Sequence, residues 1–195
     1  MSPRPRALLG LVIAALCVGS AGCRQKAKTP AEAYKRLTVA VNSGDGGAVF
    51  DALDQETRWN WMSIQKFHRE AYDIVLSNYP EGEIRQRETR RFEHAATAPS
   101  ARDLFIADAA PAILPMLRPL VLSGAPIEPG ATADDAAAVL ASGARVPLRR
   151  GKNGDWGYAG LAKRAEEDKN RAYNDLEVVR ASAADFERAA ARAGK

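Results

Sequence analysis

Residues 29–53 read TPAEAYKRLTVAVNSGDGGAVFDAL and contain the strongest local folding signals in the chain. Thr29 and Pro30 suit the N-cap and first position of a helix, and Glu32 favours the positive end of the helix dipole. Apolar residues then recur at helical spacing, as Ala33, Tyr34, Leu37, Ala40 and Val41. The turn at residues 43–45 ends this helix, and a second short helix is predicted over residues 47–53.

A third, long helix is predicted after Asp54, which is a good N-cap. Its apolar face holds Trp61, Ile64, Phe67, Ala71, Ile74 and Val75, and residues 78–82 end it. Residues 83–99 carry many charges and predict a partly helical surface segment. Ser100 can cap a further helix, after which Pro111, Pro115 and Pro119 permit only short or kinked helix as far as residue 122.

The composition changes after residue 125. Short segments separated by turn residues predict an antiparallel meander, over 126–132, 136–142, 144–150 and 155–159. Helix returns from residue 161 to the C-terminus. Its apolar seam predicts either a helix laid over the domain or pairing between two molecules: Ala172, Leu176, Val179, Ala183, Phe186, Ala190 and Ala193. The fold class is therefore α+β, with helices on an antiparallel sheet and a long C-terminal helix.

Several short stretches resemble nuclear transport factor 2-like domains: TPAEAY at 29–34, NSGD at 42–45, FDAL at 50–53 and GDWGY at 154–158. The resemblance covers residues 29–160 and implies that the helices pack inside a curved, cone-like sheet. The helical region between residues 55 and 122 is longer than the superfamily pattern, and the C-terminal helical extension over 161–195 is additional. Fold alone does not assign a function.

The first residues carry a targeting signal. Arg4 and Arg6 precede an uncharged apolar stretch over 7–18, which is too short to span a membrane. The segment resembles a bacterial lipoprotein signal, which implies a signal peptide over 1–22, lipidation of Cys23 and a tether over 23–28. Ser20 stands where such signals usually have a large aliphatic residue, and an ordinary secretory cleavage site is the alternative. The resemblance places the protein in a bacterial envelope, lipid-anchored to a membrane and facing the periplasm or the exterior.

Charge and cysteine content exclude some functions. The formal charge of +4 falls to +2 once Arg4 and Arg6 are removed, which argues against a nucleic-acid-binding protein. Cys17 leaves with the signal and Cys23 is acylated, so no thiol remains for a disulfide, a nucleophile or a thiolate metal site.

No catalytic, metal-binding or cofactor-binding residues are predicted. His68 and His94 are interpreted as satisfied surface histidines, and Asp51 and Asp54 as helix-cap or solvated acids. Two basic clusters are interpreted as solvated surface: Arg85, Arg87, Arg90 and Arg91, and Arg145, Arg149, Arg150 and Lys152.

Aromatic residues are the candidate ligand-binding groups. Trp59 lies about 130° around the third helix from the centre of its apolar face, so one of Trp59 and Trp61 is core and the other is available for contacts. The candidates for lining a cavity in the cone are Trp59, Tyr72, Trp156 and Tyr158, with ordinary core packing as the alternative. Related enzymes place an acid and a tyrosine inside the cone; Tyr34 or Tyr72 could supply the tyrosine, but no acid is assigned.

Three functions are therefore expected. The first is a non-enzymatic binding module on the membrane, for a small apolar ligand or an envelope protein. The second, by analogy with the superfamily, is an enzyme that uses the cone cavity on a steroid-like or polyketide-like substrate. The third is a structural envelope protein that acts through its C-terminal helix.

Overall fold

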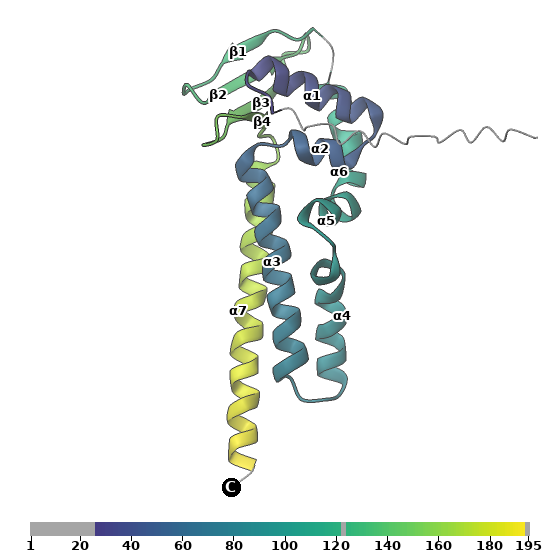
Figure 1. Ribbon diagram of the computed structural model, residues 1–195, viewed down its shortest axis with the longest axis vertical. Helices are drawn as coiled ribbons and strands as arrows, with labels where there is room; N and C mark the ends of the chain where they lie inside the picture. The colour runs from purple at the N-terminus through teal and green to yellow at the C-terminus, as the bar shows by residue number, and fades with distance from the viewer. Residues whose placement is uncertain (1–25, 122–123, 194–195) are drawn as a thin grey trace, which may run out of the picture.

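The computed structural model describes residues 26–121 and 124–193, and shows an α+β fold with two parts (Figure 1). The head holds a four-stranded sheet and short helices: β1 (Ile127–Pro129), β2 (Asp135–Val139), β3 (Arg145–Arg150), β4 (Trp156–Tyr158), α1 (Pro30–Ser43), α2 (Gly46–Ala52), α5 (Ala101–Asp108), α6 (Ala110–Leu117) and the 3₁₀ turn η1 (Arg118–Leu120). The stalk holds α3 (Gln55–Asn78), α4 (Glu83–Thr97) and α7 (Ala162–Ala193).

Side chains cap the N-termini of the first three helices, as the sequence predicts for Thr29 and Asp54. The Thr29 hydroxyl accepts from the Glu32 N–H, and the Glu32 carboxylate accepts from the Thr29 N–H, so both members of a capping box are in place. Asp45 caps α2 and Asp54 caps α3 through side-chain hydrogen bonds. Gly44 ends α1 with a φ of 70°, a conformation that glycine adopts without steric cost.

The predicted antiparallel meander is confirmed, with the strand order β1-β2-β3-β4. Ala138 pairs with Val146, and Leu148 pairs with both Ala136 and Tyr158, so these side chains share one face of the sheet. This face packs against α1 and is buried, while Arg145 and Pro147 alternate to the exposed face of β3.

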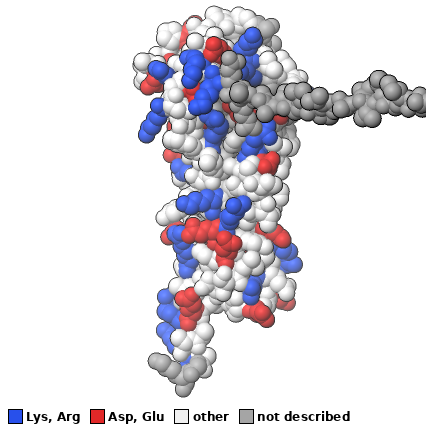
Figure 2. Space-filling model, in the orientation of Figure 1, with Lys and Arg blue, Asp and Glu red and all other residues white. Residues whose placement is uncertain are grey.

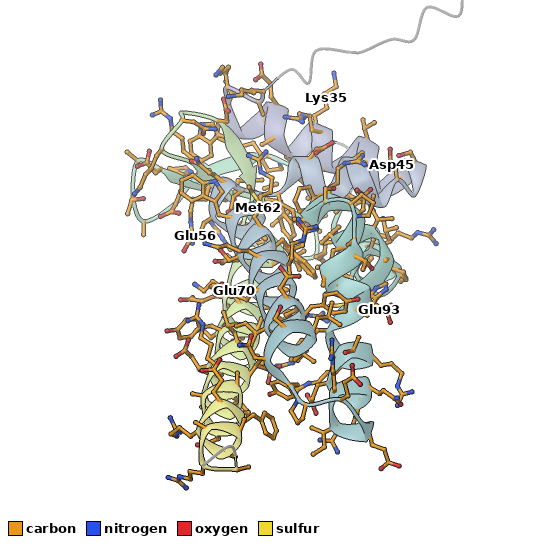
Figure 3. The ribbon with its side chains drawn as sticks, turned by 60° about the horizontal axis from the view of Figure 1, so that its bottom comes forward. Lys35, Asp45, Glu56, Met62, Glu70 and Glu93 are labelled. Carbon is orange, nitrogen blue, oxygen red and sulfur yellow. The ribbon has the colours of Figure 1, made fainter. Side chains whose placement is uncertain are left out.

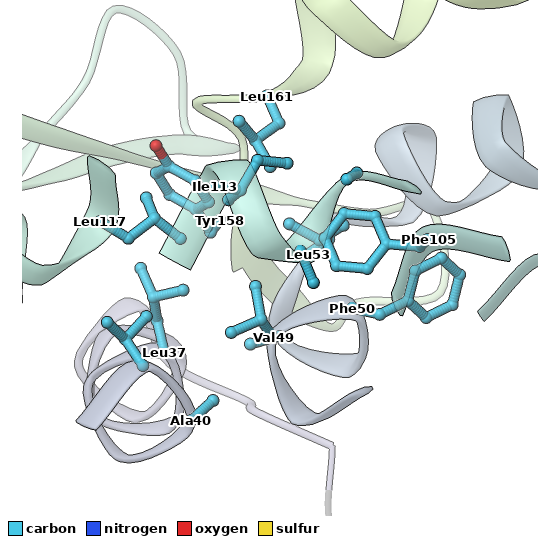
Figure 4. Close-up of a cluster of buried hydrophobic side chains, with 14 of the residues drawn as sticks. Leu37, Ala40, Val49, Phe50, Leu53, Phe105, Ile113, Leu117, Tyr158 and Leu161 are labelled. Atoms are coloured by element: carbon cyan, nitrogen blue, oxygen red, sulfur yellow. The ribbon is translucent and has the colours of Figure 1, made fainter. Parts of the chain in front are cut away.

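The main core fills the space between the sheet and the helices of the head (Figure 4). Leu37 and Ala40 of α1 point toward Val49 of α2, and Phe105 of α5 lies beside Phe50 with ring centroids 5.5 Å apart. Both Leu37 and Phe105 are completely buried.

The stalk has a second, smaller core. In Figure 1, α3 and α7 descend from the head side by side, and α4 returns toward it. Their contacts bury Ala71, Val75, Tyr79, Phe92, Leu176, Val179 and Ala183. The seam on α7 is therefore occupied within the chain as far as Ala183, which confirms that the helix is laid over its own domain; Phe186 is half-buried, and Ala190 and Ala193 are exposed.

Helix α4 is more regular than the sequence predicts. The charged segment forms an unbroken helix because Phe92, Ala95 and Ala96 lie on one side and are buried against the rest of the fold. Polar contacts reinforce this packing: Arg91 pairs with Asp175 of α7 at 2.6 Å, and Gln65 donates to the Ala98 carbonyl at 2.6 Å. The partly helical segment predicted over 83–99 is thus a full structural helix.

The N-terminal segment of the head lies along the edge of the sheet. The Trp156 N–H donates to the Ala27 carbonyl at 2.9 Å, and Ala27 is only 2% exposed. Lys26 and Lys28 both pair with Asp155, at 3.1 and 2.7 Å. The end of the predicted tether is therefore fixed to the head, whereas the predicted signal peptide and Cys23 lie outside the described residues.

In the part of the chain that the structure describes, no helix is both long enough and apolar enough to cross a membrane.

Candidate functional site

A pocket of about 360 Å³ lies where the top of α3 meets the head. Four separate segments line it: the N-terminal segment, α1, α2 with the start of α3, and the turn into β4. The lining residues are Lys26, Arg36, Phe50, Asp51, Gln55, Arg58, Trp59, Met62, Asn153, Asp155 and Trp156. Figure 3 labels Glu56 and Met62 on this head-proximal part of α3, with Glu70 further along the stalk.

The apolar wall of the pocket combines one helix and one strand. Trp59 and Met62 are three residues apart on α3 and so lie on the same side of the helix. They are 49% and 56% exposed, while Trp156 of β4 is half-buried. Trp61 is buried against Phe105 at 5.3 Å, which confirms that one of the two neighbouring tryptophans belongs to the core and the other does not.

A close backbone approach brings the two tryptophans of the pocket together. The Asp54 N–H donates to the Tyr158 carbonyl at 3.0 Å, which joins the start of α3 to β4. At Gly157 a Cβ atom would lie 2.5 Å from the Leu53 carbonyl oxygen, so a side chain there would separate the two segments. This contact places Trp156 beside the first turns of α3.

The polar wall of the pocket has an excess of cations. Within the described residues, no carboxylate pairs with Arg36 or Arg58, and the buried Nε of Arg58 has no hydrogen-bond partner. The two carboxylates are already bound: Asp51 lies 3.5 Å from the Arg102 Nε, and Asp155 binds both Lys26 and Lys28. Arg36 and Arg58 are thus the groups available to an anionic ligand.

One of the two acids of the pocket, Asp155, is a poor proton donor. Burial would raise the pKa of Asp155, but hydrogen bonds from Lys28 and Lys26 outweigh it, and the pKa is lowered. Asp51 is held beside Arg102. A general acid needs a raised pKa, so Asp155 suits ion pairing better than proton transfer.

The structure brings together two of the four predicted ligand-binding residues. Trp59 and Trp156 share the pocket, whereas Tyr72 lies on the stalk and packs against its core. Tyr158 is buried in the main core, where burial raises the pKa of its phenol. The resemblance to nuclear transport factor 2-like domains implies a cone cavity between α1 and the sheet. This space holds buried side chains: Leu37, Ala138, Val146 and Leu148.

The cationic residues of the pocket were missed in the sequence. Arg58 directly precedes Trp59, and this juxtaposition is the one local signal that could have pointed to it. Arg36 lies on another helix and Lys26 in the N-terminal segment, and only the tertiary fold brings them to the same place.

A second pocket of about 270 Å³ lies between the stalk and α5, and His68 lines it. The interpretation as a satisfied surface histidine is correct for His94, which is exposed and contacts Asp108 at 2.7 Å, and wrong for His68. His68 is partly buried, its ring is nearly perpendicular to that of Phe92, and its Nδ1 has no hydrogen-bond partner among the described residues. Burial lowers the pKa of His68; the field of Arg91 adds to this effect, and those of Asp175 and Asp108 oppose it.

Asp54 is a structural acid. It caps α3 as predicted, but it is almost completely buried, and both carboxylate oxygens accept from Thr57, at 2.7 Å from the N–H and 3.2 Å from the hydroxyl. Burial raises the pKa of Asp54 despite these bonds. Among the described residues, no three histidine, cysteine or acidic side chains converge as a metal site.

Comparisons of the chain with protein-family models, curated proteins and solved structures give no match.

Proposed function

We propose that this protein is an envelope protein held on a bacterial membrane by lipid on Cys23, and that it acts as a non-enzymatic binding module through the pocket between Trp59 and Trp156. The observation that carries the proposal is the composition of this pocket. Exposed aromatic and thioether side chains line it together with two arginines that have no carboxylate partner among the described residues.

The sequence supports the location. The apolar stretch over 7–18 ends in small residues directly before Cys23, as in lipoprotein signals. Two acyl groups on one residue give stable membrane attachment without any membrane-binding protein surface. The folded domain is then available to bind a ligand or another protein.

The chemistry of the pocket supports binding rather than catalysis. Its two acids are in ion pairs, and neither histidine lines it. Large amphipathic rings such as tryptophan contribute much apolar contact area, and arginine contributes charge-assisted hydrogen bonds. Together they favour a ligand with an apolar part and an anionic part.

The anchor is tested by replacing each cysteine in the producing bacterium. Cys23→Ala should leave the precursor unprocessed or release the protein from the membrane fraction, and the matched variant Cys17→Ala should behave as wild type. The measurement is membrane fractionation with the mass of the mature N-terminus. Normal processing and membrane attachment of Cys23→Ala would contradict the proposal.

The binding role is tested by native mass spectrometry of the purified protein. A molecule retained by wild type should be lost from Trp59→Ala, and it should be kept by Tyr173→Ala, a change at another exposed aromatic residue, on the stalk. Equal retention by both variants would place the ligand outside the pocket.

A further inference from the structure

The pocket lies close to the point where the chain would leave the membrane. Lys26 lines the pocket, and hydrogen bonds and ion pairs hold its segment to β4. Cys23 precedes Lys26 by three residues, and an extended chain spans at most about 3.5 Å per residue. If Cys23 carries the anchor, the pocket is within about 10 Å of it, comparable with the depth of a lipid headgroup layer.

The charge of the pocket complements an anionic surface. Lys26, Arg36 and Arg58 line it together with two carboxylates, and each carboxylate also binds a cation from outside the lining, Lys28 or Arg102. The net charge of these residues therefore remains positive. On the face shown in Figure 2, lysine and arginine side chains lie on the head with acidic side chains among them, and the stalk also carries both signs.

The apolar residues of the pocket suit the boundary between headgroups and acyl chains. Tryptophan concentrates at this boundary in membrane proteins because one part of its ring is apolar and its N–H can bond to polar groups. Trp59 and Met62 are about half exposed, next to the buried and unpartnered Nε of Arg58. One amphiphilic molecule could satisfy both sets of groups.

We propose that this pocket binds the phosphate-bearing headgroup of an anionic lipid in the membrane that holds the anchor. Arg36 and Arg58 bind the phosphate, and Trp59, Met62 and Trp156 contact the glycerol and the first acyl carbons. This inference rests on the proposed lipid anchor and adds the class of ligand to it. The head then lies against the membrane, and α7 leads away from the head as part of the stalk.

The test uses the lipidated protein in nanodiscs, so that the anchor is the same in every arm. One disc contains phosphatidylcholine alone, and the other contains phosphatidylcholine mixed with phosphatidylglycerol. Acrylamide quenching of tryptophan fluorescence reports whether Trp59 and Trp156 are covered. We expect reduced quenching in the anionic discs, and loss of this protection in Arg58→Gln and in Arg36→Gln. Arg90→Gln is a matched change of charge on the stalk and should keep the protection.

Circular dichroism of each variant checks that the fold is retained. Equal quenching in the two discs would overturn the inference, as would loss of protection in Arg90→Gln. A third arm adds inorganic phosphate to the phosphatidylcholine discs. Protection by free phosphate alone would overturn the assignment to a lipid. Failure of the protein to stay on either disc would contradict the anchor itself, and this inference with it.

Discussion

Replacing Leu176 by alanine tests whether the packing of α7 on α3 stabilises the whole molecule. Leu176 is 1% exposed and belongs to the core of the stalk, whereas Val178 on the same helix is 60% exposed. Val178→Ala is therefore a matched control: it removes apolar atoms from α7 without opening a cavity.

The magnitude follows from the composition of the stalk core. Leucine-to-alanine changes at buried positions cost about 2–5 kcal/mol, and the larger costs occur where the surroundings cannot close the cavity. Ala71 and Ala183 are short, and the aromatic members of this core, Tyr79 and Phe92, have rigid rings, so we expect the surroundings to close the cavity only in part. We expect Leu176→Ala to cost about 3 kcal/mol, which lowers the melting temperature by about 6–12 °C for a chain of this size. Val178→Ala should change the free energy of unfolding by less than about 0.5 kcal/mol.

The assay is urea unfolding of the processed protein, followed by far-ultraviolet circular dichroism and by tryptophan fluorescence. The first signal is dominated by the long helices, and Trp61 in the main core contributes to the second. Phe67 packs against both cores, and α3 continues from one to the other, so the two signals should shift together in Leu176→Ala. Equal small losses in both variants, or a shift in the dichroism signal alone, would refute this reasoning.

Three other outcomes follow from the structure. Phe186→Ala should cost about 2 kcal/mol, because the ring is half-buried, and sedimentation should show no change of mass with concentration. Because the pKa of His68 is lowered in the folded protein, the unfolded chain binds the proton more tightly. Wild type should therefore lose stability as the pH falls below about 6.5, the pKa of an unperturbed histidine. In pH-dependent melts, His68→Gln should lose less stability over the same range. Gly157→Ala should be severely destabilising, since its Cβ would overlap backbone atoms, whereas Gly143→Ala should show only the cost of a positive φ, about 1 kcal/mol, in the same melts.

Local signals predicted most of the helices and the order of the strands. The caps at Thr29 and Asp54 are encoded by adjacent residues, and the turn residues separate the strands in the sequence itself. The strand lengths were predicted less well: β1 covers only Ile127–Pro129, whereas the sequence predicted residues 126–132. A strand ends where its hydrogen bonds to the neighbouring strand end, and the local sequence of one strand does not show where that neighbour lies.

Helix α4 shows how tertiary contacts override composition. Its residues are mainly charged, and its mean hydropathy gave no reason to expect burial. Phe92 belongs to the core of the stalk, Ala95 belongs to the main core, and Arg91 pairs with Asp175 of α7. A sequence-based prediction that considered one helix at a time could not include these contacts.

The sequence predicts the aromatic residues of the candidate site. Trp59 was identified because it falls outside the apolar face of its helix, and Trp156 because it lies on the last strand. The cationic half depends on long-range contacts: Leu53 and Asp54 join the start of α3 to β4, and Ala27 joins the N-terminal segment to the same strand. The local sequence gives no signal of such long-range contacts, so it does not identify Arg36 and Arg58 as ligand-binding residues.

The segment along β4 also covers an edge of the sheet. β4 is the last strand of the sheet, and its outward backbone groups are already used: the Trp156 N–H by the Ala27 carbonyl, and the Tyr158 carbonyl by the Asp54 N–H. An uncovered edge is a template for strand addition by another chain. A truncated protein that begins at residue 29 would lose Ala27 from the core and free the Trp156 N–H at this edge, so we expect its tendency to form intermolecular sheet to rise and its melting temperature to fall.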